Sequence, residues 1–202
     1  MSEATATHAA VVLAAGGSRR LGRPKQLLRR DGETLVHRAL RLAAATGPQR
    51  LVLVTGADAT LISDAGAGLG AESVFNPDWS LGLASSLQRA ATALQGFDGS
   101  VLVLGCDQPA LAIDHLLALL RGAGESTSGC AATAHGDAAG IPALVSMALM
   151  QACTQLRGDR GLGAQLTAMA ASVWRMDAPE LRLDIDREDD VAAAAAMGLL
   201  DR

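Results

Sequence analysis

Aromatic residues are scarce in this 202-residue chain, which has two Trp, two Phe and no Tyr. Proteins that bind single-stranded nucleic acid stack its bases on aromatic side chains, so this composition argues against that class. The formal net charge of −4 and the isoelectric point near 5.5 argue against broad contact with a phosphate backbone. We therefore expect no nucleic-acid partner.

Cysteines and long apolar runs are scarce too. Cys106, Cys130 and Cys153 are widely spaced and form no C-x-x-C pair, so neither a disulfide framework nor a zinc site is expected. No apolar run reaches the ~18 residues that span a bilayer, and the first residues lack the basic and apolar segments of a signal peptide. These absences predict a cytoplasmic protein without a membrane contact.

Short apolar runs alternate with longer segments of helical periodicity. Three runs predict strands that are buried on both faces, at residues 9–13, 51–55 and 101–104. Weaker strands are expected at residues 73–75, 131–134, 143–145 and 173–174. Helices are expected at residues 34–45, 59–67, 83–94, 113–120, 147–156, 162–170 and 187–199. The glycine-rich pieces at residues 66–70 and 122–124 are interpreted as loops.

This alternation predicts an α/β fold with a mostly parallel, Rossmann-like sheet, in a single three-layer, doubly wound domain over residues 1–202. In such sheets, ligands bind beyond the carboxyl ends of the strands. The loops that follow Leu13, Phe75 and Leu104 are therefore the candidate ligand-binding loops.

The loop after the first strand, residues 14–25, has the composition of a phosphate-binding loop, and we call it the signature loop. Gly16 and Gly17 let a ligand approach the backbone closely, and free N–H groups together with Arg20 and Lys25 can meet negative charge. Two familiar motifs do not match. A Walker A loop needs Gly-Lys-Ser/Thr where Gly22 is followed by Arg-Pro, and a dinucleotide-binding turn needs G-x-G-x-x-G.

Two acidic segments are candidates for holding a divalent cation. Asp107 directly follows the third apolar strand, where a carboxylate can hold Mg²⁺ against phosphates; alternatively, it caps the next helix or makes an Asx turn. Alternation along residues 184–186 would put Asp184 and Asp186 on one face and Ile185 on the other. Asp186 is the better candidate, although acidic residues at the start of a helix are also ordinary caps.

The loop after Phe75 offers polar groups. An Asn-Pro turn precedes Trp79, and Gly82 leads into a helix whose first turn carries Ser85 and Ser86. These hydroxyl and N–H groups suit a polar or anionic ligand. The alternative is a capped helix in which the indole is a packing anchor. No serine has an evident His and Asp partner, so no catalytic triad is predicted.

Several of these motifs resemble those of a known family. Residues 13–25, L-A-A-G-G-S-R-R-L-G-R-P-K, resemble the L-A-A-G-x-S-x-R-M-G-x-x-K signature of nucleotidyltransferases, with Leu21 where Met is usual. Residues 76–87, N-P-D-W-S-L-G-L-A-S-S-L, and residues 106–109, C-D-Q-P, resemble one branch, the molybdenum cofactor cytidylyltransferases. Segments 140–144, 156–161 and 184–186 continue the resemblance, which covers nearly the whole chain.

The resemblance implies an enzyme that transfers CMP from CTP to the phosphate of molybdopterin and releases pyrophosphate. Carried over by position, the nucleotide-binding residues would be Leu13, Ala14, Ala15, Gly16, Gly17, Ser18 and Lys25. The catalytic residues would be Lys25, Arg20 and Asp107, and Asp107 and Asp186 would hold Mg²⁺. The acceptor side would be lined by Trp79, Gly82, Ser85 and Ser86. The implied partners are CTP and molybdopterin, and a molybdenum enzyme or its insertion chaperone.

Other interpretations stay open. The pair Ala14-Ala15 resembles the cytidine-using members, whereas a second glycine is usual in the guanylyltransferases. The alternatives are a related transferase that uses GTP or a sugar or alcohol phosphate, and a non-catalytic accessory protein for molybdenum cofactor. The presence of both Asp107 and Lys25 favours catalysis. Arg19 and Arg23 fall at variable positions of the signature and are predicted to be surface charge.

Overall fold

The three apolar runs lie at the middle of the sheet in the computed structural model, which describes residues 7–202. β1 (His8–Leu13) lies between β4 (Arg50–Thr55) and β6 (Ser100–Gly105) and pairs with both in parallel. Residues on both faces of β1 are fully buried, which explains why its sequence is continuously apolar rather than alternating.

The outer strands complete a seven-stranded sheet in the order β5-β4-β1-β6-β8-β7-β9. β5 (Glu72–Phe75) extends the parallel half beside β4. β8 (Ala138–Ser146) runs antiparallel to β6 and to β7 (Ala131–His135), and β9 (Trp174–Asp177) is parallel to β7. The sheet is therefore mostly parallel, and the predicted α/β fold class is confirmed.

Helices cover both faces of this sheet. One face carries α1 (Leu35–Ala44), α2 (Ala59–Ala65) and α4 (Ile113–Glu125), and its core includes Leu40 together with Val12 of β1. The other face carries α3 (Leu83–Ala93), α5 (Met147–Ala152) and α6 (Gly163–Ala168), and its core includes Leu87 together with Val11. Because neighbouring residues of β1 point to opposite faces, one strand contributes to two cores.

The glycines near residue 122 correct one sequence prediction. Gly122 and Gly124 were expected in a loop, but α4 continues through both as far as Glu125. A Cβ atom built on Gly122 would lie 2.1 Å from Cδ2 of Trp174. The glycine therefore lets the helix pack closely against the indole, and it does not mark a turn.

Other differences concern the ends of elements. The strand expected at residues 143–145 is the centre of the longer β8, and the helix expected at residues 147–156 ends at Ala152, followed by a 3₁₀ helix, Cys153–Gln155. The sequence did not predict the small hairpin of β2 (Arg29–Arg30) and β3 (Glu33–Thr34). Strands of two residues are too short to leave a periodic pattern.

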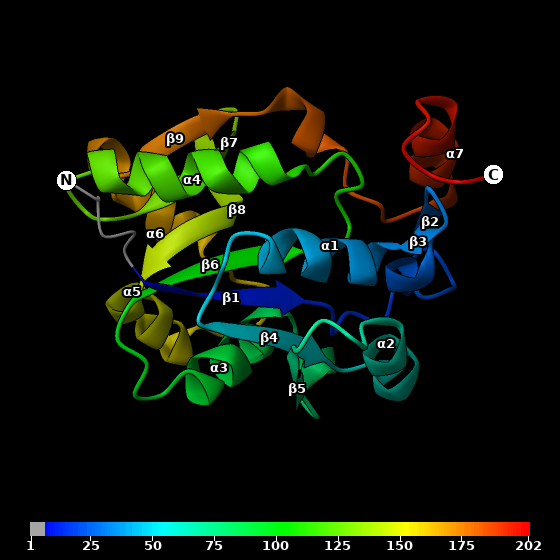
Figure 1. Ribbon diagram of the computed structural model, residues 1–202, viewed down its shortest axis with the longest axis horizontal. Coiled ribbons are helices and arrows are strands. Elements are labelled where there is room, and N and C mark those ends of the chain that lie inside the picture. The colour runs from blue at the N-terminus through cyan, green and yellow to red at the C-terminus, as the bar shows by residue number, and fades with distance from the viewer. Residues whose placement is uncertain (1–6) are drawn as a thin grey trace.

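The C-terminal residues pack against the signature loop. α7 (Glu188–Ala196) lies beside the β2–β3 hairpin, at the end of the molecule to which β1 points (Figure 1). The Asp201 carboxylate accepts hydrogen bonds from the backbone N–H groups of Asp31 (2.7 Å) and Gly32 (2.8 Å). A separate buried cluster joins the two regions: Leu21, Leu35, Ile185, Ala194 and Leu200. This packing brings residues 184–186 to the carboxyl ends of β1 and β6.

Among residues 7–202, no helix combines the length and the apolar character that crossing a membrane requires.

Candidate active site

The signature loop leaves β1 with a row of unpaired backbone N–H groups. The Ala14 N–H still donates to the carbonyl oxygen of Val54 (2.9 Å) and continues the sheet. From residue 15 to residue 20, the backbone N–H groups meet no acceptor within the described part of the chain. Ser18 then turns the chain in a left-handed conformation (φ 46°). Successive free N–H groups at the end of a strand form a concavity that suits an anion.

The Gln26 side chain supports this loop through hydrogen bonds to its backbone. The sequence analysis did not predict this role. Its side chain is buried, and Nε2 donates to the carbonyl oxygens of Ala14 (2.9 Å) and Gly16 (2.7 Å). The Ser18 hydroxyl also accepts a hydrogen bond from the backbone N–H of Lys25 (3.1 Å). A glutamine that follows a lysine does not by itself predict a loop-supporting role, because its burial is visible only in the fold.

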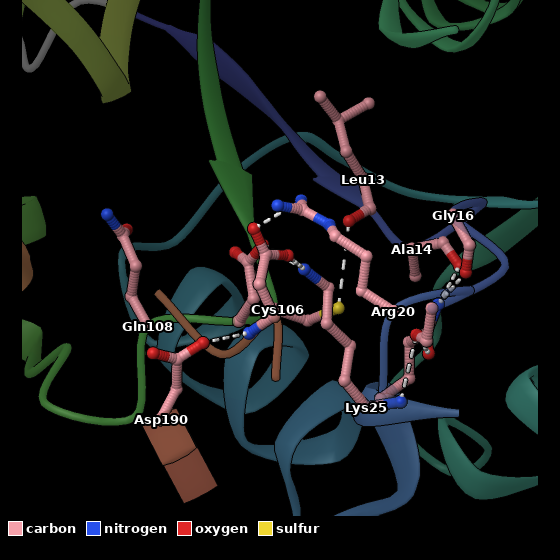
Figure 2. Close-up of polar contacts among 12 residues, drawn as sticks. Leu13, Ala14, Gly16, Arg20, Lys25, Cys106, Gln108 and Asp190 are labelled. Atoms are coloured by element: carbon pink, nitrogen blue, oxygen red, sulfur yellow. Dashed lines mark hydrogen bonds and ion pairs between the residues drawn. The ribbon is translucent and has the colours of Figure 1, made fainter. Parts of the chain in front are cut away.

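Lys25 lies between two carboxylates from distant parts of the chain (Figure 2). Its Nζ donates to Oδ2 of Asp107 (2.8 Å) and to Oδ1 of Asp186 (2.9 Å), and Nη2 of Arg20 pairs with Oδ2 of Asp186 (2.6 Å). Lys25 is the single lysine of the chain, whose other cationic side chains are arginines and histidines. A compact ammonium group with three donors can reach two carboxylates at once, which suits this position.

The charges of this cluster reinforce one another. Burial lowers the pKa of Lys25, but the Coulomb attraction and hydrogen bonds of Asp107 and Asp186 outweigh it, so the pKa is raised above its ordinary value. Burial raises the pKa of Asp186, but the hydrogen bond and charge of Lys25, followed by those of Arg20, lower it below the ordinary value. The ammonium and the Asp186 carboxylate are therefore both charged near neutral pH.

Asp107 and Asp186 fit a divalent cation by their donor chemistry. Their oxygens lie within 2.8 and 2.9 Å of one point, which the Lys25 ammonium now occupies. Mg²⁺ commonly takes one or two protein carboxylates, retains waters and completes its shell with substrate phosphates. Across residues 7–202, no group of three or more His, Cys, Asp or Glu side chains forms a complete protein cage for a metal. The site thus suits a cation that arrives with a phosphate ligand.

Asp184 lies near this cluster but does not line the cavity described below. Ile185 is fully buried, and its backbone N–H donates to the carbonyl oxygen of Asp107 (2.9 Å). Desolvation and the Asp107 carboxylate raise the pKa of Asp184 to about 6. Asp190, near the start of α7, accepts hydrogen bonds from the backbone N–H groups of Asp186 (3.0 Å) and Arg187 (2.8 Å), so Asp190 acts as the cap and leaves Asp186 to the site.

Another wall of the site is formed by Trp79, in the 3₁₀ helix Trp79–Leu81. Two glycines make room for its indole: a Cβ atom on Gly17 would lie 2.7 Å from Cζ3, and one on Gly56 would lie 2.6 Å from the Trp79 Cβ. Arg19 lies over the indole, with its guanidinium carbon 5.5 Å from the ring centroid. Arg19 is exposed, as the sequence predicts, but it also lines the cavity, whereas Arg23 forms an exposed pair with Glu188.

A cavity of about 390 Å³ opens between these walls. Its lining contains every residue predicted for the site except Ser85. It also contains residues that the sequence analysis did not assign to a ligand: Arg19, Gln26, Ser80, Leu83, Cys106 and Asp159. The structure thus gathers the signature loop, the segment after β5 and both metal-binding candidates around one space.

Ser85 lies behind the cavity wall. Asn76 is fully buried, and its Nδ2 donates to the hydroxyl oxygens of Ser85 (2.8 Å) and Ser86 (3.1 Å). The Ser85 hydroxyl in turn donates to the carbonyl oxygen of Gly82 (2.8 Å). Ser85 therefore ties the start of α3 to the preceding turn, and only Ser86 reaches the cavity.

Gly82 lets a distant loop reach the same wall. It has φ of 103°, and a Cβ atom there would lie 2.5 Å from the carbonyl carbon of Gly158 and 2.6 Å from Oδ1 of Asp159. The Ala84 N–H donates to the Gly158 carbonyl (3.0 Å) and fixes this contact. Residues 156–161 thereby bring the Asp159 carboxylate to the cavity.

Cys106 contributes packing and not reactivity. Burial, followed by the charge of Asp107, raises the pKa of its thiol to about 12. Its Sγ is 3.7 Å from the carbonyl oxygen of Leu13, to which the thiol donates. Because only a thiolate is a strong nucleophile, this cysteine supplies no covalent step. The chemistry of the cavity is that of clustered charges and free N–H groups.

Known proteins resemble this chain in sequence and in fold. A family model described as the MobA-like NTP transferase domain matches residues 10–173. The bifunctional protein GlmU of Acidovorax ebreus is 41% identical over 124 residues, which are 57% of this chain and 26% of that protein. The chain thus spans about a quarter of the length of this curated relative.

Two solved structures are similar along nearly the whole chain. A homologue of Mycobacterium tuberculosis Rv0371c from Mycobacterium sp. strain JC1 is 29% identical, with a TM-score of 0.81 over 95% of this chain and 96% of the other. Rv0371c of M. tuberculosis H37Rv, in a complex with manganese, is 25% identical, with a TM-score of 0.75 over 93% and 97% of the two chains. Asp186 lies beyond the residues that the family model matches, so the segment after residue 173 completes the site.

Proposed function

This chain belongs to the family of MobA-like NTP transferase domains and is a nucleotidyltransferase, and from that premise we propose that it transfers CMP from CTP to the phosphate of molybdopterin. The observation that carries this proposal is the position of Lys25, which bridges Asp107 and Asp186 beside the free N–H groups of the signature loop. Such a cluster is suited to a triphosphate and its counter-ion.

The reaction needs no protein nucleophile. An oxygen of the acceptor phosphate attacks the α-phosphorus of CTP and forms a new P–O bond, while the bond from the α-phosphorus to the bridging oxygen breaks. Pyrophosphate leaves with the electron pair. A phosphate monoester is already ionised at neutral pH, so no general base is required, and catalysis rests on positioning and on cations that neutralise developing charge.

The residues of the cavity divide this work. The free N–H groups of residues 15–20 would bind the triphosphate. Lys25, now paired with Asp107 and Asp186, would turn to the α-phosphate when the nucleotide binds. Arg20, already paired with Asp186, contributes a second positive charge. Asp107 and Asp186 would hold Mg²⁺, which would supply further charge neutralisation at the phosphates. Trp79, Gly82 and Ser86 line the acceptor side of the same cavity.

The choice of CTP is supported by the wall beneath the nucleotide. Ala14 and Ala15 both line the cavity at the start of the loop, where they are almost fully buried. Two methyl groups leave less room there than glycine would, which favours a pyrimidine over a purine base. Turnover measured with CTP, GTP, ATP and UTP at equal concentration tests this choice, and a preference for GTP would contradict it.

The direct test is pyrophosphate release by the purified protein with MgCTP and molybdopterin. We expect release that depends on both substrates and that is lost in Lys25→Ala. The proposal fails if molybdopterin yields no pyrophosphate while a control cytidylyltransferase releases it under the same conditions.

A second candidate keeps the chemistry but changes the acceptor to a sugar phosphate or an alcohol phosphate. The Asp159 carboxylate on the cavity wall favours it, because a carboxylate readily accepts hydrogen bonds from hydroxyl groups. The same pyrophosphate assay, run with these acceptors, separates the two. A purely accessory role in molybdenum cofactor insertion has less support, since Lys25 and both carboxylates are in place.

A further inference from the structure

Arg19 is a cationic side chain that lines the cavity but has no role in the proposed reaction. Arg20 is bound to Asp186, and Lys25 is bound to Asp107 and Asp186. In the part of the chain that the structure describes, Arg19 has no carboxylate partner and makes no hydrogen bond to another residue; its guanidinium lies over the Trp79 ring. Its N–H donors therefore remain available to a ligand.

The platform under Arg19 is a built feature of the fold. Gly17 follows β1 and Gly56 follows β4, and a side chain at either position would collide with Trp79. The Trp79 side chain is thus packed against two separate loops, which restricts where its ring can lie. A guanidinium stacked on a fixed ring keeps its edge free while its orientation is restricted.

The place of this pair indicates which substrate it meets. The free N–H groups of residues 15–20 and the Lys25 cluster provide for the triphosphate of the donor. Trp79 comes from the segment after β5, which also supplies Ser80, Gly82 and Ser86 to the wall of the cavity. An acceptor that approaches along this wall brings a doubly charged phosphate, and the planar fork of a guanidinium can bind two phosphate oxygens at once and leave the third to attack.

We propose that Arg19, held on the Trp79 ring, binds the acceptor phosphate and aligns it with the α-phosphorus of the donor. This proposal rests on the proposed nucleotidyl transfer and adds a residue that selects phosphorylated acceptors. Arg19 touches the substrate directly, and Trp79 is a positioning residue that acts through Arg19.

The fluorescence of Trp79 can report ligand binding next to Arg19. The chain has two tryptophans, so a Trp174→Phe background leaves Trp79 as the single indole. Titration of this protein with methyl phosphate reports binding next to Arg19, and titration with inorganic pyrophosphate reports binding at the signature loop. We expect Arg19→Gln to weaken methyl phosphate binding at least tenfold and pyrophosphate binding less than twofold. Arg23→Gln, which removes an exposed charge four positions away, is the control and should change neither.

Steady-state kinetics give the second readout. Arg19→Gln should raise the KM for the phosphorylated acceptor by ten- to a hundredfold and leave the KM for CTP within twofold, and Arg19→Lys should lie in between because it keeps the charge without the fork. Three results overturn the proposal: no methyl phosphate binding near Trp79 in the parent protein, unchanged binding in Arg19→Gln, or a selective loss of pyrophosphate or CTP binding. Absence of transfer to molybdopterin would refute the proposed function, while the fluorescence titration still decides the role of Arg19.

Discussion

The ammonium of Lys25 occupies the point between Asp107 and Asp186 at which a divalent cation would bind, so lysine and metal compete for the same carboxylates. Lys25→Met removes the competing charge and nearly preserves the length of the side chain. We therefore expect the variant to bind Mn²⁺ more tightly than the parent protein in the absence of nucleotide, even though its catalytic rate falls.

The size of this effect follows from the two contacts. Each charge-assisted hydrogen bond contributes about 1.5–3 kcal/mol. The side chains of Asp107 and Asp186 are 29% and 37% exposed, so solvent screens both interactions, and half of the lower sum, about 1.5 kcal/mol, is the appropriate magnitude. That free energy corresponds to about tenfold in the Mn²⁺ dissociation constant.

The assay is electron paramagnetic resonance of free Mn²⁺ titrated with nucleotide-free protein. Lys25→Arg, which keeps a positive charge, is the matched control and should not gain affinity. Equal Mn²⁺ affinity in the parent protein and Lys25→Met, with both folded by circular dichroism, would refute the competition. Because the chain has a single lysine, ¹⁵N-lysine labelling gives one side-chain resonance, and this resonance should move when MgCTP draws the ammonium from the carboxylates.

Further predictions concern the candidate site, the glycines that pack against the two tryptophans, and one surface ion pair. Asp107→Ala should lower kcat by at least about two orders of magnitude, the usual effect of losing a positioned charge at a reacting phosphate; near-normal turnover would remove it from the catalytic group. Gly17→Ala should displace the indole, since its Cβ would lie 2.7 Å from the ring, and change Trp79 emission in the Trp174→Phe background; unchanged emission would show that the contact relaxes without moving the ring. Gly122→Ala should destabilise the fold by about 1–3 kcal/mol through overpacking against the Trp174 indole, whereas Gly124→Ala, which has open space in the same helix, should be neutral or stabilising; equal melting temperatures would contradict this. The hydrogen bond from Arg41 and, to a smaller extent, that from His37 lower the pKa of Glu33 to about 2 against partial burial, so its contribution to stability is present above its ordinary pKa of 4.5 and is lost as the pH falls from there toward 2. Urea denaturation of Glu33→Gln should show a weaker dependence on pH in that window, and an unaltered slope would argue against the pairing.

Much of the fold follows from local properties of the sequence. The continuous apolar runs of β1, β4 and β6 predict buried parallel strands, because such strands face a helical layer on both sides. The weak strands and the ends of helices were harder to predict. The extent of β8 depends on its antiparallel partners, and the course of α4 through Gly122 depends on Trp174, which lies far along the chain.

In the candidate site, too, some features follow from the local sequence and others depend on tertiary contacts. The sequence by itself determined that a glycine-containing loop with Arg20 and Lys25 ends a buried strand, and that Asp107 ends another, because strand periodicity and residue chemistry are local. Only the tertiary structure decided that Lys25 bridges Asp107 and Asp186, that Gln26 anchors the loop, that Ser85 faces inward and that Arg19 lies on Trp79. The contacts of Lys25 and Arg19 join segments that the crossovers of the sheet bring together at one end, and the spacing of residues along a chain carries no record of such contacts. Those of Gln26 and Ser85 are closer in the sequence, but they depend on which side chains the fold buries.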